Sequence, residues 1–182
     1  MAFLTFDDLR QLSRGLDESG IIKFAKGAPQ GKTVFLSHSS KDGAYIAGAI
    51  KFFERFNASV YVDEADNTLP SKPSPATANT LRTWIQACKR FVIMASDNSR
   101  DSRWIPWELG LADGTKGVAQ VALLPIGPTD TEQYWAELEY LGLYPRILLR
   151  QFKGDAGPLW RVYDPRDRKC WHLVDWLHKD IA

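Results

Sequence analysis

The stretch RFVIMAS, residues 90–96, decides the fold. It is a nearly continuous run of apolar, strand-forming side chains that ends on a serine. Four similar runs occur along the chain: TVFLS at 33–37, SVYVD at 59–63, VALLPI at 121–126 and RILL at 146–149. Helical patterns lie between them, at 41–56, at 77–87, in a segment ending near Asp113, and at 131–141. Strands that are apolar on both faces and alternate with helices form a parallel sheet that is covered on both sides.

The fold class expected from this order is α/β, with a flavodoxin-like, doubly wound five-stranded parallel sheet and flanking helices. A length of 182 residues, 45% of them apolar, suits one domain with a substantial core. The Gly- and Pro-containing stretch GAPQGK, residues 27–32, reads as a linker. We therefore expect residues 1–32 to be an amino-terminal helix and linker, and residues 33–182 to be the main domain, including a carboxyl-terminal helix.

Both ends of the chain carry amphipathic patterns. Thr5 and Asp8 have the spacing of a capping box, which predicts a short amino-terminal helix. Its apolar stripe comprises Leu4, Leu9, Leu12 and Leu16. The stretch KCWHLVDWLHKDI, residues 169–181, predicts one more helix. Its inward-facing side chains are expected to be Trp171, Val174, Leu177 and Ile181.

Composition excludes several functional classes. With 23 basic and 22 acidic residues the formal charge is +1, so no broad field attracts nucleic acid or an anionic membrane. The amino terminus contains no long apolar stretch, so we expect neither a signal peptide nor a membrane span, and a cytoplasmic protein. Cys88 and Cys170 lack the C-x-x-C spacing of metal or redox sites and are expected to be reduced thiols, with no metal bound.

In a doubly wound sheet, ligands bind beyond the carboxyl ends of the strands, where the strand order reverses. The segments that follow the first three strands are SHSSKD at 37–42, DEADNTLPSKPSP at 63–75 and SDNSRDSRWIPWELG at 96–110. None contains G-x-G-x-x-G or a Walker phosphate loop, which disfavours the dehydrogenases and nucleotide hydrolases that use these motifs. Ser39 and Ser40 could donate to a phosphate or ribose, or could simply cap the next helix.

Glu108 is the strongest candidate for a reacting group. It lies among tryptophan, isoleucine and leucine side chains, and Trp104 precedes it by four positions, which places both on one face of a regular helix. An aromatic plane beside a carboxylate suits a flat cationic ring attached to a sugar. The alternatives are core packing for Trp104 and Trp107 and an exposed ion pair for Glu108. Pro106 adds a constraint, because proline is comfortable only in the first turn of a helix.

The combination of VFLSHSSKD (34–42), VYVDE (60–64) and FVIMASDNSRDSRWIPWELGLA (91–112) resembles the TIR (Toll/interleukin-1 receptor) domain family, in its bacterial NAD-cleaving branch. The resemblance covers residues 33 to about 150. It implies that Glu108 is the catalytic glutamate and that Trp104 is the tryptophan four residues before it. Asp63 matches an acid near the bound nucleotide, and Ser37, His38, Ser39 and Ser96 fall at the same pocket. His38 is expected to be a hydrogen-bonding wall residue rather than a base.

The resemblance also implies an activity: cleavage of the bond between nicotinamide and ribose in NAD+, giving nicotinamide and a linear, cyclic or transferred ADP-ribose. NAD+ would be the substrate, with no other cofactor. The chain is similar to the standalone TIR proteins of Thoeris-type anti-phage systems, because about thirty residues before the domain are too few for a sensor domain. Activation would then come from a partner chain, a phage protein or TIR–TIR self-association, and a separate effector would read the product.

Two other functions remain open at this point. Some TIR domains are non-catalytic scaffolds that act by TIR–TIR assembly, and such a protein would not need Glu108. The Pro- and Ser-rich loop after Asp63 replaces the short glycine-containing loop by which many TIR domains stack. A nucleoside deoxyribosyltransferase-like enzyme would share the fold type and a catalytic glutamate, although the SHSSKD segment and Trp104 fit the TIR family better.

Overall fold

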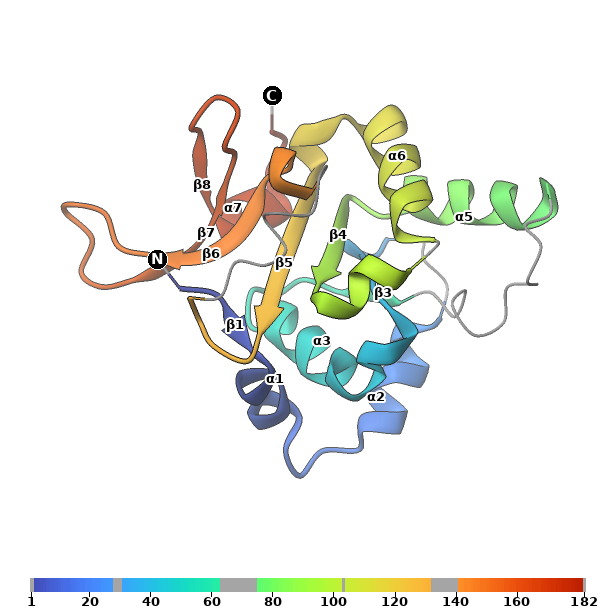
Figure 1. Ribbon diagram of the computed structural model, residues 1–182, viewed down its shortest axis with the longest axis horizontal. Coiled ribbons are helices and arrows are strands. Elements are labelled where there is room, and N and C mark those ends of the chain that lie inside the picture. Colours follow the sequence, from blue (N-terminus) through green and yellow to red (C-terminus); the bar gives the residue numbers. More distant parts are fainter. Residues whose placement is uncertain (1, 28–30, 63–74, 103, 132–140, 182) are drawn as a thin grey trace.

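The computed structural model describes residues 2–27, 31–62, 75–102, 104–131 and 141–181. It contains all five of the strands that the sequence predicts: β2 (Val34–Ser37), β3 (Val60–Val62), β4 (Arg90–Ala95), β5 (Val121–Gly127) and β6 (Arg146–Arg150). They pair in the order β3-β2-β4-β5-β6, and each of these pairs is parallel. The order reverses between β2 and β4, so the predicted α/β, doubly wound arrangement is confirmed and the expected crevice lies beyond the carboxyl ends of these two strands (Figure 1).

Within the described residues the sheet has eight strands, three more than the sequence predicts. The first addition is β1 (Leu4–Thr5), which pairs in parallel with the carboxyl end of β5. The others, β7 (Leu159–Tyr163) and β8 (Cys170–His172), are antiparallel and extend the sheet beyond β6, at the left of Figure 1. These strands are short and only partly buried, so they lack the continuous apolar run that marks the central five.

The predicted carboxyl-terminal helix over 169–181 is wrong in its first part. Residues Cys170–His172 form β8, and the helix α7 covers only Leu173–His178. Trp176 is completely buried, whereas Val174, which was expected to face inward, is 45% exposed. Pairing with β7 fixes residues 170–172 in an extended conformation, and this shifts the buried face of the helix that follows.

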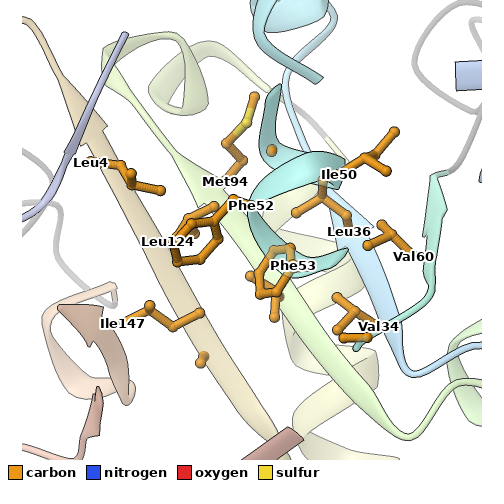
Figure 2. Packing of buried hydrophobic residues seen from close by; sticks show 14 of the residues in the cluster. Leu4, Val34, Leu36, Ile50, Phe52, Phe53, Val60, Met94, Leu124 and Ile147 are labelled. Carbon is orange, nitrogen blue, oxygen red and sulfur yellow. The ribbon is translucent and has the colours of Figure 1, made fainter. Parts of the chain in front are cut away.

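Helices cover both faces of the sheet. The helices α1 (Phe6–Ser13), α2 (Glu18–Ala25), α3 (Ile46–Glu54) and α7 contribute to the core on one face, and α5 (Pro75–Ala87) and α6 (Ile105–Lys116) to the core on the other. Figure 2 shows the first core, in which Phe52 and Phe53 of α3 face Leu36, Met94 and Leu124 of the strands. Alternate residues of each strand enter opposite cores, as expected for a sheet buried on both sides.

The amino-terminal segment packs into the first core. The predicted capping box is confirmed: the Thr5 hydroxyl accepts a hydrogen bond from the Asp8 N–H at 3.0 Å, and the Asp8 carboxylate accepts from the Thr5 N–H at 2.8 Å. Leu9 is fully buried against α3, where Gly48 is required because a Cβ there would collide with the Leu9 backbone. Leu16 lies beyond the end of α1 and is 48% exposed, so the predicted apolar stripe is longer than the helix. The predicted helix at 131–141 lies almost entirely outside the described residues.

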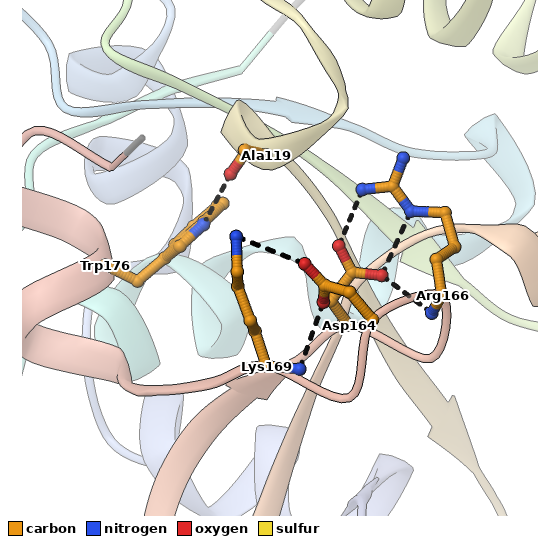
Figure 3. Close-up of polar contacts among 6 residues, drawn as sticks. Ala119, Asp164, Arg166, Lys169 and Trp176 are labelled. Atoms are coloured by element: carbon orange, nitrogen blue, oxygen red, sulfur yellow. Dashed lines mark hydrogen bonds and ion pairs between the residues drawn. The ribbon is translucent and has the colours of Figure 1, made fainter.

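The carboxyl-terminal segment is fastened to the amino-terminal edge of the central strands. The Trp176 indole N–H donates to the Ala119 carbonyl at 2.9 Å (Figure 3). The turn between β7 and β8 is held by its own ion pairs, in which Asp164 binds Arg166 and Asp167 binds Lys169. The Trp176 hydrogen bond and the pairing of β6 with β7 and of β7 with β8 join these elements to the parallel sheet.

Candidate active site

The two residues at the centre of the site lie at the carboxyl ends of the neighbouring strands β2 and β4. Ser37 is the last residue of β2, and Glu108 lies in the first turn of α6, the helix that follows β4. The Ser37 hydroxyl donates a hydrogen bond of 2.5 Å to Oε2 of Glu108. Both residues are buried, with 2% and 4% of their surface exposed. The structure therefore places a carboxylate at the predicted crevice and orients it with a neutral hydroxyl.

The start of α6 explains how Glu108 reaches this position. The Ser102 hydroxyl accepts hydrogen bonds from the N–H groups of Trp104 and Ile105, each at 3.3 Å. The helix begins at Ile105, so Pro106 falls in its first turn, where its missing N–H costs nothing. The Glu108 N–H then donates to the Trp104 carbonyl at 2.8 Å. The amino-terminal end of a helix carries partial positive charge, which stabilises a carboxylate in this turn.

Trp104 is the N-cap of α6, one helical turn before Glu108, and is partly buried. It packs against the core beneath α6 and meets Trp107 edge-to-face, with ring centroids 5.9 Å apart. Trp107 itself is 37% exposed. Because the helix starts at Ile105, Trp104 precedes its first residue, and the shared face of the indole and Glu108 stays a prediction. Core packing accounts for part of the Trp104 surface.

The other predicted site residues have different surroundings. Ser39 is buried, and its hydroxyl caps the turn η1 (Ser40–Tyr45) by accepting from the Lys41 N–H at 3.4 Å. His38 is half-buried between Ser37 and Ser39 in the same segment. Ser96 is buried at the end of β4 and donates to a carboxylate of the protein. Asp63 and the loop at 64–74 lie outside the described residues, so the expectation for Asp63 stays a prediction.

Asp42 is a member of this region that the sequence did not single out. It is fully buried, and its two carboxylate oxygens accept from the Ser96 hydroxyl and the Asn98 amide, each at 2.6 Å. The sequence signal is weak, because Asp42 stands in a polar turn where most acids are exposed. Its burial depends on partners 54 and 56 residues away along the chain.

The site is built from carboxylates, hydroxyls and an indole. In the part of the chain that the structure describes, no group of three His, Cys, Asp or Glu side chains is arranged to hold a metal ion. Across the same described ranges, no helix is long and apolar enough to span a membrane.

Comparison with known proteins agrees with this arrangement. Residues 34–152, more than half of the chain, match the family model described as TIR domain. A probable 3′ cyclic ADP-D-ribose synthase of Bacillus cereus is 42% identical over 116 residues, covering 63% of this chain and 59% of that protein. A putative cyclic ADP-D-ribose synthase of Cytobacillus dafuensis is 35% identical over 79 residues, covering 42% of this chain and 21% of that protein. With the strand order, the buried glutamate after β4 and the extent of the family match in agreement, the chain belongs to the TIR domain family.

Proposed function

We propose that this protein cleaves the nicotinamide–ribose bond of NAD+ and closes the released ADP-ribose into a cyclic product. The observation that carries the proposal is the buried Ser37–Glu108 pair at the carboxyl edge of β2 and β4. Trp104 is the N-cap of the helix that carries Glu108. The names of the two relatives, both cyclic ADP-ribose synthases, support cyclisation as the outcome.

The reaction requires a carboxylate that stabilises positive charge, and it does not require a proton donor. Nicotinamide in NAD+ is already cationic, so the electron pair of the breaking carbon–nitrogen bond leaves with a neutral molecule and no proton has to be supplied. Positive charge then develops on the ribose carbon. A carboxylate fixed in a buried site stabilises this charge more strongly than water does, because its surroundings do not have to reorganise.

Glu108 is in a position to serve in this role. Its oxygen is held by the Ser37 hydroxyl, and a ribose hydroxyl of the substrate can make the same kind of contact with the carboxylate. Trp104, one helical turn before Glu108, offers an aromatic face that attracts the cationic ring in the ground state. The ribose carbon is finally attacked by a hydroxyl of the substrate, which gives the cyclic product, or by water, which gives ADP-ribose.

The biological setting belongs to the proposal as well. We propose that the product is a signal in bacterial anti-phage immunity, made in the cytoplasm and read by a separate effector. The trigger would be a phage protein, a partner chain or TIR–TIR self-association. The family membership and the two cyclic ADP-ribose synthases among its relatives support this setting.

The test is to incubate concentrated protein with NAD+, with and without extract of phage-infected cells, and to measure nicotinamide and every adenine-containing product by chromatography. Glu108→Gln keeps the shape and the hydrogen bond to Ser37 but removes the charge. We expect it to lower nicotinamide release by about 100-fold or more.

The matched control is Glu54→Gln, the same chemical change in an acid that is 42% exposed and paired with Lys51 on the surface. This variant should release nicotinamide at the wild-type rate. Equal rates for Glu108→Gln and the wild type, or no nicotinamide from the wild type under either condition, would contradict the proposed enzyme and favour a scaffold.

A further inference from the structure

Asp42 is a buried acid that the proposed reaction does not use. Its side chain has no exposed surface, and both of its oxygens are occupied, one by the Ser96 hydroxyl and one by the Asn98 amide. A buried carboxylate is costly unless hydrogen bonds compensate it, and replacement of buried ionic groups by apolar ones of similar size is often neutral or stabilising. The Asp42 contacts therefore have a role other than stability alone.

The Asp42 contacts join the two segments that carry the active site. Asp42 lies in η1, which follows β2, whereas Ser96 and Asn98 begin η2 (Asp97–Asp101), which follows β4. The η2 side is itself rigid, because Ser96 and Ser99 cap each other's backbone and the Ser99 hydroxyl donates to the Met94 carbonyl at 3.1 Å. Asp42 is thus bound to a fixed point at the end of the central strand.

The reacting groups lie on either side of this connection. Ser37 precedes η1 and Glu108 follows η2, so the distance between the two loops determines how Ser37 meets Glu108 and how wide the crevice is. An exposed ion pair between Lys41 and Asp101 connects the same loops at 2.6 Å. Exposed pairs of this kind contribute little because water and salt screen them, so the buried Asp42 contacts carry the connection.

We propose that Asp42 is a positioning residue that sets the ratio of cyclic to linear product, an inference that rests on the proposed function. When the bond to nicotinamide breaks, its electron pair leaves with nicotinamide and the ribose carbon bonds to the nearest oxygen. If that oxygen is a substrate hydroxyl, its proton passes to Glu108 or solvent and the ring closes. If the crevice loosens, water takes that place and linear ADP-ribose forms.

The test uses Asp42→Asn, which keeps the size of the side chain but removes its capacity to accept from both partners at once, and Ser96→Ala, which removes one partner. We expect each variant to lower the cyclic-to-linear ratio by roughly tenfold, because a misplacement of about 1 Å can cost as much as about 100-fold in rate. The double variant should lower the ratio by less than the product of the two single effects, since both changes act on the same hydrogen-bonded group. Asp101→Asn, which removes the exposed pair to Lys41, is the matched control and should keep the wild-type ratio.

A purely structural role for Asp42 predicts a different result. Nicotinamide release and thermal stability would fall while the product ratio stayed constant, and this outcome in Asp42→Asn and Ser96→Ala would overturn the inference. Linear ADP-ribose as the sole wild-type product would also overturn it, while leaving the nucleosidase reaction intact. Absence of nicotinamide from the wild type would instead refute the proposed function, and the inference with it. Ser96→Ala, the milder change, decides the question if Asp42→Asn does not fold.

Discussion

The two ends of the central strand β4 both bury charged groups, and they satisfy them in different ways. Arg90, the first residue of β4, is 1% exposed and donates to the backbone carbonyls of Trp176 and Lys179 at the end of α7. At the other end, Asp42 accepts from the Ser96 hydroxyl and the Asn98 amide. The buried Glu108 accepts from the hydroxyl of Ser37, at the end of the neighbouring strand β2.

The difference separates a structural end of the sheet from a reactive one. Carbonyls at a helix end have no alternative partner once they are buried, so their bonds to Arg90 serve to hold the carboxyl-terminal segment. A side-chain hydroxyl such as that of Ser37 can yield its place to a hydroxyl of a substrate. The comparison predicts that changes at the Arg90 end lower stability and spare activity, whereas changes at the Glu108 end lower activity.

The largest effect on stability is expected for Arg90→Met. This variant keeps most of the apolar stem but leaves the carbonyls of Trp176 and Lys179 without their donor, which should lower the free energy of unfolding by about 3 kcal/mol. Urea unfolding measures the loss, and nicotinamide release per folded molecule should be unchanged. Arg10→Met, at an exposed arginine paired with Asp7, should be nearly neutral. A neutral Arg90→Met would contradict the structural role of this end.

Trp176→Phe should lower the free energy of unfolding by about 2 kcal/mol. The change leaves a void in a fully buried position and removes the hydrogen bond to the Ala119 carbonyl. The Arg90 guanidinium lies 5.2 Å from the centre of the Trp176 ring, so the two losses should be less than additive in the double variant. Full additivity in urea unfolding would show that the Arg90 and Trp176 contacts are independent.

At the reactive end, Ser37→Ala should lower kcat/KM for nicotinamide release by about tenfold, because Glu108 loses the donor that orients it. Ser13→Ala is a matched control: Ser13 is also buried and donates to a glutamate, Glu18, at 2.7 Å, but it lies in α1. The control should lose similar stability and no activity. Equal loss of kcat/KM in both variants would contradict a specific role for Ser37.

The central fold could be predicted from sequence because a strand that is buried on both faces consists of a continuous run of apolar residues. Each of the five central strands carries a run of apolar residues, and RFVIMAS is the clearest case, so these strands and the helices between them can be placed from local pattern. The strand β1 has only two residues and owes its conformation to β5, and β8 owes its own to β7. Such strands are defined by their partners, and a local pattern cannot reveal them.

The residues of the candidate site also differ in whether the local sequence reveals them. Glu108 and Trp104 could be chosen because their local company is unusual, an acid within an apolar helix start that includes a proline. Asp42 could not, since nothing near it in the chain distinguishes it from an exposed acid, and its burial follows from Ser96 and Asn98. Ser96, which the family resemblance places at the pocket, donates its hydroxyl to Asp42.

The smallest effect is expected for the pH dependence of stability at Cys88, two residues before Arg90. It tests whether water reaches the Arg90 end of β4. Burial raises the pKa of the Cys88 thiol from 9.0 to about 12, although Lys116 and Lys32 oppose the shift. The unfolded chain then releases this proton near pH 9 while the native state retains it, so the stabilising contribution is complete below pH 9 and is lost as the pH rises toward 12. One unit above 9.0, at pH 10, the loss should be about 1.4 kcal/mol. Urea unfolding at pH 8 and pH 10 should show a smaller drop for Cys88→Ala than for the wild type, and equal drops would mean that water reaches this end of the sheet.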